Sequence, residues 1–377
     1  MTQDPVRGLA MRSLVTEDGQ LRVYLEETAF RAPEEGELLV RVEASPVNPS
    51  DLGMMLGPAH TARFETVADA GRPEVAAQIP ATHMAGVASR IGQPLPVGNE
   101  GAGTVVAAGA GAEAYLGKTV AMLGGSMYAQ YRLIKAREVM VLPEGASAAD
   151  GASCFVNPLT ALGMVETMRA EGHTALVHTA AASNLGQMLN RICLKDGVSL
   201  VNVVRSPAQA AILKGEGARW VVDSSAPDFQ AALTDAIAEA GATIAFDAIG
   251  GGEMAGAILK AMEAALMRGA GEYARYGSPV HKQVYLYGGL DTRPTVIDRT
   301  FGMSWGVGGW LLTWFMQKAG AQTAQRLRQR VMDELKTTFA SHYTAELSLS
   351  EMVTPDAIAG FVRKATGEKY LINPARG

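Results

Sequence analysis

The chain has 377 residues, 48% of them hydrophobic and 19% charged, and a formal net charge of −5 at pH 7. This length suggests two domains, and the high hydrophobic share excludes a disordered protein. The acidic excess offers no basic surface to nucleic acid or to an anionic membrane, which favours a small-molecule partner. Two cysteines, Cys154 and Cys193, are too few for a disulfide framework or a four-cysteine zinc site. We therefore expect a protein of a reducing compartment, the cytoplasm.

Residues 301–316, FGMSWGVGGWLLTWFM, come closest to a membrane span, but four glycines interrupt them. A membrane-spanning helix needs about 20 apolar residues, so we expect a buried or interface strand followed by the start of a helix. The first 15 residues lack the long apolar core of a signal peptide. No membrane partner is therefore predicted.

Up to about residue 150 the sequence consists of short alternating segments separated by glycine and proline. Alternation of apolar and polar residues is typical of half-buried strands, so we expect a small antiparallel, barrel-like domain. Residues 58–96 interrupt it and are predicted to form a loop or lid with a short helix. The predicted strands are 21–28, 36–45, 101–109, 118–123, 129–136 and 138–143.

From about residue 157 predicted strands alternate with helices of about a dozen residues, which indicates a parallel, doubly wound sheet that binds a nucleotide. The C-terminal residues 344–374 return to a strand, a helix and a short strand, and we expect them to pack on the first domain. The nucleotide domain is then an insert. Its predicted strands are 174–180, 198–206, 219–225, 242–251 and 282–290, and its helices 183–197, 207–218, 227–240 and 253–268.

The first strand-to-helix turn of this domain, TAAASNLGQ, has the properties of a pyrophosphate site. Small residues let the backbone approach a phosphate, and Gly186 lets the helix press on the strand. The usual G-x-G-x-x-G is largely absent, so an ordinary strand-to-helix turn explains the segment equally well. The predicted cofactor residues of this turn are Ala181, Ser183, Asn184, Leu185 and Gly186.

The second strand ends in NVVRS, where NAD-binding turns usually have an acidic residue for the ribose hydroxyls. Arg205, 22 positions after Ser183, can instead receive a 2′-phosphate, with help from Ser206 and Lys214, and this favours NADPH. A solvated surface arginine is the alternative. Further along, Tyr287, Gly288 and Gly289 end a late strand, where the nicotinamide half of the cofactor is expected.

Seven stretches, in this order and spacing, resemble the medium-chain dehydrogenase/reductase superfamily, specifically its zinc-free branch of quinone oxidoreductases and 2-enoyl thioester reductases. The resemblance implies a GroES-like β-barrel catalytic domain at 1–156 and 319–377 and a Rossmann domain at 157–318. It also implies an NADPH-dependent enzyme that transfers hydride to a quinone or an activated C=C bond. The stretches are VEASPVNPSD, VGNEGAGTVVAAG, FVNPLTALGMV, SNLGQ, NVVRS, YGGL and GGWLLTW.

Zinc-dependent alcohol dehydrogenases of this superfamily carry a cysteine near the position of Asp51 and a histidine at that of Asn99. Neither cysteine of this chain lies near those positions, so no catalytic zinc is expected. An acceptor that is already electrophilic does not need such a Lewis acid. Quinones, enones and enoyl thioesters meet this condition.

The resemblance to the enoyl thioester reductases implies a proton-donating tyrosine a few residues after NPSD, but Ala59 stands at about that position. His60 is the nearest alternative acid, since an imidazole titrates near neutrality. His83, Tyr128 and Tyr131 are further candidates. Quinone reduction is less demanding because water can protonate the product. The missing tyrosine also leaves open a catalytically weak NADPH-binding sensor or structural protein.

Five other residues of these motifs have polar or charged side chains. Asn48 and Asp51 are predicted to orient the nicotinamide or the substrate, although both fit a local turn that satisfies its own backbone. Asn157 and Thr160 are predicted to reach the cofactor, against a helix-capping alternative. Glu100 is expected to fix its loop by pairing with an arginine or backbone amides.

Three tryptophans, Trp305, Trp310 and Trp314, are candidates for an apolar substrate pocket. The resemblance places their segment at a sheet edge that pairs with a second subunit, so a homodimer is expected. The candidate catalytic residues are therefore Asn48, Thr160 and His60, and the candidate pocket residues are Asp51, Tyr128 and Trp310.

Overall fold

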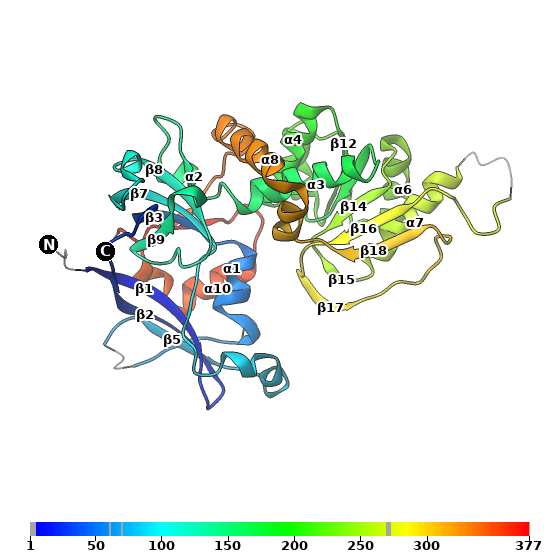
Figure 1. Cartoon of the computed structure of the whole chain (residues 1–377). Helices are drawn as coiled ribbons and strands as arrows, with labels where there is room; N and C mark the ends of the chain where they lie inside the picture. The colour runs from blue at the N-terminus through cyan, green and yellow to red at the C-terminus, as the bar shows by residue number, and fades with distance from the viewer. Residues whose placement is uncertain (1–4, 60–61, 69–70, 269–272, 377) are drawn as a thin grey trace. The chain divides into compact units, whose positions relative to one another are not determined.

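The computed structural model describes residues 5–59, 62–68, 71–268 and 273–376. The chain folds into two compact units (Figure 1). The first unit combines Met1–Val156 with Arg330–Gly377, and the second unit is Asn157–Gln329. His60, one of the candidate acids, lies outside the described residues.

The first sheet of the first unit is antiparallel, with the strand order β4-β5-β2-β1-β6. On β2, Leu21, Val23 and Leu25 are buried while the residues between them face outward, which is the alternation that the sequence predicted. These side chains join the main core of the unit. The strands are β1 (Val6–Val15), β2 (Gln20–Phe30), β4 (Glu65–Thr66), β5 (Glu74–Gln78) and β6 (Leu95–Pro96).

The second sheet of the first unit has the order β10-β8-β7-β3-β20-β19, with β9 also paired to β3. The C-terminal strand β20 pairs with β3, so the chain end returns to the first unit as expected from the sequence. The strands are β3 (Glu37–Pro46), β7 (Glu100–Ala108), β8 (Thr119–Leu123), β9 (Tyr131–Lys135), β10 (Met140–Val141), β19 (Ala345–Leu347) and β20 (Tyr370–Ile372).

Helices of the first unit start at well-formed caps. The hydroxyls of Ser147, Ser348 and Thr354 each accept a backbone N–H in the first turn that follows. The helices are α1 (Pro49–Met55), α2 (Ala148–Gly151), α9 (Leu349–Met352) and α10 (Pro355–Arg363), and the short 3₁₀ turns are η1 (Gly57–Ala59), η3 (Glu113–Tyr115) and η4 (Ala136–Glu138).

The segment 58–96 contains more regular structure than the predicted loop or lid. Strand β5 extends the first sheet by pairing with β2, and a 3₁₀ segment, η2 (Ala81–Arg90), follows it. Arg90 ties this segment to helix α1, because its Nη2 donates to the carbonyl of Met54 at 3.3 Å and to Ser13 Oγ at 3.1 Å. The strand was missed because only two of its residues, Val75 and Ala77, show the apolar alternation.

The second unit is built on a six-stranded parallel sheet with the order β13-β12-β11-β14-β16-β18, the predicted doubly wound arrangement. Its central strands are buried on both faces, as parallel sheets require. The strands are β11 (Ala175–His178), β12 (Ser199–Val204), β13 (Trp220–Asp223), β14 (Ile244–Asp247), β16 (Lys282–Leu286) and β18 (Trp305–Gly309). A separate pair joins β15 (Gly250–Gly252) to β17 (Asp291–Thr295).

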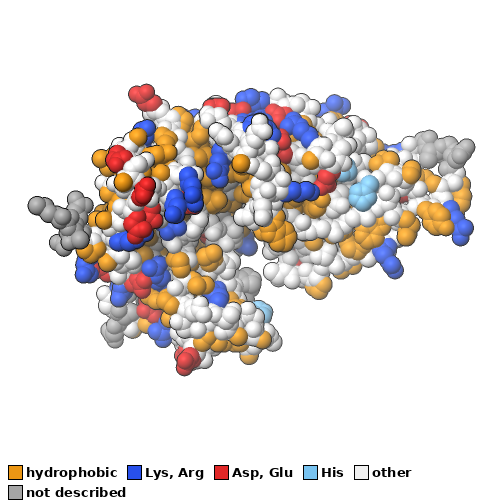
Figure 2. Space-filling model, viewed as in Figure 1, with side chains coloured by type: hydrophobic (Ala, Val, Ile, Leu, Met, Phe, Trp, Pro, Cys, Tyr) orange, Lys and Arg blue, Asp and Glu red, His pale blue; other side chains and the backbone are white. Residues whose placement is uncertain are grey.

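Helices alternate with these strands. The crossover helices are α4 (Asn184–Asp196), α5 (Pro207–Gly215), α6 (Phe229–Ala240) and α7 (Met254–Met267). Two longer helices, α3 (Val156–Ala170) and α8 (Leu312–Asp333), precede and follow the sheet. Charged side chains of both signs are interspersed on the visible surface of the protein (Figure 2).

The apolar segment 301–316 contains strand β18 and the start of helix α8, as predicted. Within the described part of the chain, no helix combines the length and the apolar character that a membrane crossing needs. Helix α8 bends at Gly320, whose φ of +81° suits glycine. The predicted return at residue 319 lies next to this bend, whereas the second segment of the first unit begins at Arg330.

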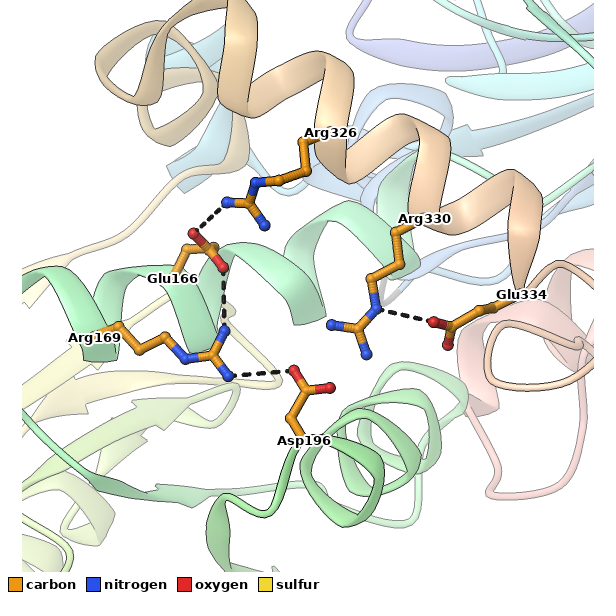
Figure 3. A network of polar contacts seen from close by, with 6 residues as sticks. All are labelled: Glu166, Arg169, Asp196, Arg326, Arg330 and Glu334. Carbon is orange, nitrogen blue, oxygen red and sulfur yellow. Dashed lines mark hydrogen bonds and ion pairs between the residues drawn. The ribbon is translucent and has the colours of Figure 1, made fainter.

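A surface ion-pair network joins three helices of the second unit (Figure 3). Glu166 on α3 accepts from Arg326 on α8 at 2.7 Å and from Arg169 at 3.3 Å. Arg169 also contacts Asp196 on α4 at 3.3 Å. Arg326 is more than half exposed, and exposed pairs contribute only about 0–1 kcal/mol each, so the network adds little to stability.

Candidate functional site

The turn between β11 and α4 has the geometry of an anion site. Ser183 is the N-cap of α4, and its Oγ accepts from the N–H of Gly186 at 3.2 Å. A side chain at Gly186 would collide with the carbonyl of Ala181, so this position needs glycine. Ala180 has a φ of +51°, a left-handed conformation that is uncommon outside glycine and concentrated at functional sites.

The first turn of α4 retains a free backbone donor. The N–H of Leu185 has no partner among the described residues, because Ser183 caps the amide of Gly186 instead. Free N–H groups and the helix dipole together favour a bound phosphate at such a helix start. Of the predicted residues, Leu185 is therefore a candidate donor to a phosphate, while Ser183 and Gly186 shape the turn.

A second feature of this region was missed in the sequence. Thr179 Oγ1 donates to Asp247 Oδ1 at 2.6 Å and accepts from the N–H of Ala248 at 2.8 Å. Asp247 also accepts from the amides of Ile249 and Gly250. This joint ties the carboxyl ends of β11 and β14 together and so supports the cofactor turn. The sequence signal that could have revealed this joint is an aspartate at the end of an apolar strand, in IAFDAIGG.

Arg205 extends from the carboxyl end of β12. Its backbone N–H donates to Gln209 Oε1 at 2.9 Å, and its exposed guanidinium has no partner among the described residues. Ser206 is the N-cap of α5, with its Oγ accepting from the N–H of Gln209 at 3.3 Å. Lys214 lies exposed in the last turn of the same helix. At the end of β12, Arg205 therefore offers a positively charged side chain that has no partner among the described residues.

The stretch Tyr287–Leu290 follows β16 and approaches the end of β14 closely. The N–H of Tyr287 donates to the carbonyl of Asp247 at 3.0 Å. A Cβ at Gly288 would lie 2.6 Å from the carbonyl oxygen of Ala248, which explains the glycine, whereas Gly289 faces open space. The hydroxyl of Tyr287 lies 2.7 Å from Nε2 of the buried His178.

Asn157 and Thr160 are buried in the first turns of α3, within the second unit. Neither side chain has a hydrogen bond to another described residue, so both keep polar groups for a ligand. Thr160 precedes Gly163 by three positions and therefore shares its helix face. The indole of Trp310 packs on that face at Gly163.

Trp310 is held by several contacts within the second unit. Its Nε1 donates to Thr167 Oγ1 at 3.1 Å, and its ring stacks on Phe315 and meets Phe246 edge-on, with centroids 5.7 and 6.0 Å apart. The residue is half-buried. Trp305 packs on Phe301, and the side chain of Trp314 is exposed.

Four residues of the first unit, Asn48, Asp51, Asn99 and Glu100, form what we call the acidic corner. Asp51 accepts from the backbone amides of Asn48 at 2.8 Å and of Asn99 at 2.7 Å. Glu100 accepts from Asn48 Nδ2 at 2.7 Å and from the amides of two following residues, 155 and 156, at 2.9 Å each. The corner thus fixes the start of α1, which matches the structural role expected for Glu100.

Both carboxyls of the acidic corner are buried. Burial raises the pKa of Asp51 to about 7, although the two amide donors act to lower it. Burial likewise raises the pKa of Glu100. The charge of the buried Lys369 acts on both carboxyls. Its Nζ donates to Ser153 Oγ at 2.8 Å, and burial lowers its pKa to about 8. Within the described residues, no three His, Cys, Asp or Glu side chains come together as a metal site.

The other candidate acids of the first unit differ in burial, and the position of the expected tyrosine lies in the core. Ala59, at the position of the expected tyrosine, is fully buried in the core of the first unit. Tyr128 is also buried, with its hydroxyl donating to the carbonyl of Pro46 at 3.0 Å. His83 is exposed and contacts the carbonyl of Pro58. Tyr131 is half-buried and packs on the ring of a neighbouring phenylalanine, Phe30.

Comparison with known proteins agrees with this architecture. Residues 34–144 match the model of the alcohol dehydrogenase GroES-like domain. A structure from Mesorhizobium loti, provisionally described as an NADPH:quinone reductase, is 26% identical and superposes with a TM-score of 0.72, covering 99% of this chain and 100% of that one. These matches make the chain similar to proteins of the medium-chain dehydrogenase/reductase superfamily. Its similarity lies with the quinone oxidoreductases and enoyl reductases of that superfamily.

Two further proteins of this superfamily illustrate the range of the similarity. A quinone oxidoreductase from Pseudomonas aeruginosa is 28% identical over 138 residues, which are 36% of this chain and 42% of that enzyme. The chain therefore aligns with less than half of that relative's length. A mutant enoyl thioester reductase from Candida tropicalis, 17% identical, has a TM-score of 0.66 over 98% of this chain and 100% of its own. That likeness concerns the fold.

Proposed function

We propose that the protein is an NADPH-dependent reductase that transfers hydride to a quinone or to an activated C=C bond without zinc. The observation that carries the proposal is the cofactor turn of the second unit. This turn combines a left-handed Ala180 with a Gly186 that leaves no room for a side chain. Within the described residues, the N–H of Leu185 and the guanidinium of Arg205 have no hydrogen-bond partner. When bound, NADPH supplies the hydride.

Different residues of the chain bind different parts of the cofactor. The first turn of α4 holds the pyrophosphate, and Arg205 holds the 2′-phosphate by a charged fork. Asn157 and Thr160 offer an amide and a hydroxyl, and Tyr287 and the two glycines after it border the nicotinamide half. Ser206, whose hydroxyl caps α5, assists only through its position beside Arg205.

We propose a quinone as the preferred acceptor. An enoyl thioester needs a proton at carbon, and the residue at the donor position, Ala59, is a methyl group inside the core. A reduced quinone is protonated on oxygen, which water can do without a placed acid. Trp310 supplies apolar surface beside Thr160, consistent with a flat acceptor. Asn48, whose amide is held by Glu100, then acts by shaping the active-site loop.

The purified protein would be tested with NADPH and a panel of 1,2- and 1,4-quinones, enones and enoyl thioesters, following absorbance at the nicotinamide band. We expect turnover with at least one quinone and little or none with enoyl thioesters. A preference for enoyl thioesters would overturn the acceptor assignment and direct attention to His60. Tight NADPH binding without oxidation by any acceptor would overturn the enzymatic proposal.

The buried Ala59 also favours a second candidate, a protein that binds NADPH as a sensor or structural module with little turnover. The two candidates share the cofactor turn and differ only in the fate of the hydride. The acceptor panel therefore distinguishes them. Slow oxidation that is independent of acceptor concentration would support the sensor.

We further propose a homodimer through the edge of the second unit's sheet. Strand β18 is an edge strand, and nearby Met303 and Trp314 have exposed fractions of 74% and 69%. Unpaired edges with exposed apolar side chains are typical association surfaces. Light scattering after size exclusion should give twice the chain mass, and Trp314→Glu should give a monomer. The control Leu116→Glu, exposed on the first unit, should remain dimeric.

A further inference from the structure

Three buried polar side chains lie together next to the cofactor turn of the second unit: His178 on β11, Asn202 on β12 and Asn190 on α4. Their exposed fractions are 0, 0 and 2%. Buried polar groups are normally hydrogen-bonded, so each unpaired atom in such a place calls for an explanation. None of the three residues was singled out in the sequence.

His178 is satisfied on one side only. Its Nε2 lies 2.7 Å from the hydroxyl of Tyr287, and the two rings are stacked with centroids 5.7 Å apart. Its Nδ1 is buried and has no hydrogen-bond partner in the described part of the protein. Burial lowers the pKa of His178 to about 3, so the ring is neutral at physiological pH and carries one N–H.

Two further unpaired atoms, Asn202 Oδ1 and Asn190 Nδ2, complete the cluster. His178 and Asn202 are directly opposite in the parallel pair β11–β12, so their side chains leave the same face of the sheet. Asn202 Nδ2 makes a long contact of 3.5 Å to Asn190 Oδ1. The three unsatisfied atoms therefore belong to neighbouring side chains, and they include a donor, an acceptor and a ring nitrogen that can be either.

We propose that one water molecule binds between His178 Nδ1, Asn202 Oδ1 and Asn190 Nδ2, and that this bridge makes His178 the positioning residue for Tyr287. The water accepts from Nδ1–H of His178 and from Asn190 Nδ2, and donates to Asn202 Oδ1. Three hydrogen bonds are typical of a buried water. With its proton on Nδ1, His178 accepts the hydroxyl hydrogen of Tyr287 at Nε2 and holds the phenol ring in place.

This inference rests on the proposed function in one respect, the place of Tyr287 beside the nicotinamide half of NADPH. Loss of His178 leaves the phenol hydroxyl without its partner and frees the ring. Binding of the nicotinamide end should then weaken, while binding of the adenosine end, held by Arg205 and α4, should not change. A general loss of structure would affect both ends equally.

The first experiment measures binding by calorimetry with two probes, NADPH and adenosine 2′,5′-bisphosphate, which lacks the nicotinamide half. We expect His178→Phe to raise the dissociation constant of NADPH about five- to tenfold and that of the bisphosphate less than twofold. His178→Gln, whose amide oxygen can accept from Tyr287, should recover most of the loss. Equal weakening of both probes by His178→Phe, or no weakening of NADPH, would overturn the positioning role.

The second experiment determines which ring nitrogen of His178 carries the proton. Nitrogen-15 spectra of protein labelled at its six histidines should contain one neutral ring protonated on Nδ1 that does not titrate between pH 5 and 8. The signal of His178 is identified by its disappearance in His178→Phe. If that signal shows protonation on Nε2, the water bridge is contradicted. A high-resolution crystal structure should show one water within hydrogen-bonding distance of all three atoms, and a direct His178–Asn202 bond in its place would exclude that water.

The controls separate this inference from the proposed function. If adenosine 2′,5′-bisphosphate does not bind the unmodified protein, the NADPH proposal fails, while the tautomer and the water can still be observed. If both probes bind but the spectra contain no Nδ1-protonated ring, the bridge fails and the NADPH proposal stands.

Discussion

The cofactor turn of the second unit and the acidic corner of the first unit both derive from motifs with polar residues, but they use their hydrogen-bonding capacity differently. In the acidic corner, the Asp51 and Glu100 carboxylates together accept five protein donors. In the cofactor turn, the N–H of Leu185 and the guanidinium of Arg205 have no partner within the described residues. Hydrogen-bond donors that have no partner in the described protein indicate a ligand site, whereas acceptors that are fully hydrogen-bonded indicate a structural role.

This difference bears on the two halves of a reduction. In the proposed function, the residues that hold the hydride donor are those of the cofactor turn and Arg205, all in the second unit. The position where related reductases are expected to place a proton donor is the buried methyl group of Ala59. The comparison therefore predicts that changes in the acidic corner alter stability, whereas changes in the cofactor turn alter binding.

The largest effect is expected from Glu100→Ala. The substitution leaves the amide of Asn48 and two backbone N–H groups without an acceptor, and each unsatisfied buried donor costs about 1–3 kcal/mol. Urea unfolding should show a loss of about 3 kcal/mol or more. The control Glu113→Ala, at an exposed site of the same unit, should change stability by less than about 0.5 kcal/mol. A small loss in Glu100→Ala would remove the structural role of the corner.

The second prediction concerns pH. Because the pKa of Asp51 is raised to about 7 in the folded state, the unfolded chain releases this proton first as pH rises above about 4. Asp51 therefore makes the free energy of unfolding fall between about pH 4 and 7, by on the order of 2–4 kcal/mol, and adds no further change above pH 7. Lys369, with a lowered pKa of about 8, acts in the opposite direction from about pH 8 to 10.

Unfolding titrations at several pH values would test this pH dependence. Asp51→Asn should have a less negative slope than the unmodified protein between pH 4 and 7, whatever its overall stability. Equal slopes would mean that Asp51 titrates normally in the folded protein. An Asp18→Asn variant, at an exposed turn, serves as the control.

The third prediction concerns the cofactor turn itself. Gly186→Ala introduces a methyl group against the carbonyl of Ala181 and displaces the start of α4. We expect NADPH to bind at least 50-fold more weakly by fluorescence titration. Gly215→Ala, in the last turn of α5, where nothing lies near the added carbon, should bind within threefold of the unmodified protein. Equal effects of the two substitutions would contradict the assigned turn.

The fourth prediction isolates the 2′-phosphate. Arg205→Ala should weaken NADPH binding about tenfold, which is about 1.4 kcal/mol, and leave NADH binding within twofold. Arg219→Ala, another exposed arginine of the second unit, should change neither. Unchanged preference for NADPH over NADH in Arg205→Ala would mean that another group reads the phosphate.

The smallest effect is expected at Ala180. Its φ of +51° is strained for alanine, and glycine relieves that strain at the cost of extra entropy in the unfolded chain. Thermal unfolding of Ala180→Gly should show a gain of about 0.5 kcal/mol, with NADPH affinity unchanged. A loss of stability would mean that the turn does not require a left-handed residue here.

The sequence predicted the second unit better than the first. Strands such as 198–206 are continuous apolar runs between helices, and their order in a parallel sheet follows from chain connectivity. Strand β5 could not be identified, since it has too few residues to establish a period. The Thr179–Asp247 joint links the neighbouring strands β11 and β14, and the His178–Tyr287 contact links the ends of β11 and β16, which lie on either side of β14. The partners are therefore 68 and 109 residues apart in the sequence.

A sequence motif predicts that a residue belongs to a site more readily than it predicts what the side chain does there. Arg205 and Gly186 were predicted because the nucleotide-binding pattern puts such residues at fixed places after a strand, and their cofactor roles stay predictions. Asn48 and Tyr128 were singled out for chemistry, but their side chains donate to Glu100 and to the carbonyl of Pro46. A sequence does not reveal which hydrogen bonds are already made.

The most direct test of the account is the rate of quinone-dependent NADPH oxidation, measured side by side for the unmodified protein and Gly186→Ala at equal concentration. The account predicts turnover by the unmodified protein and a near-complete loss in the variant at an NADPH concentration close to the dissociation constant of the unmodified protein. No oxidation by the unmodified protein with any quinone, or equal rates in the two proteins, would contradict it.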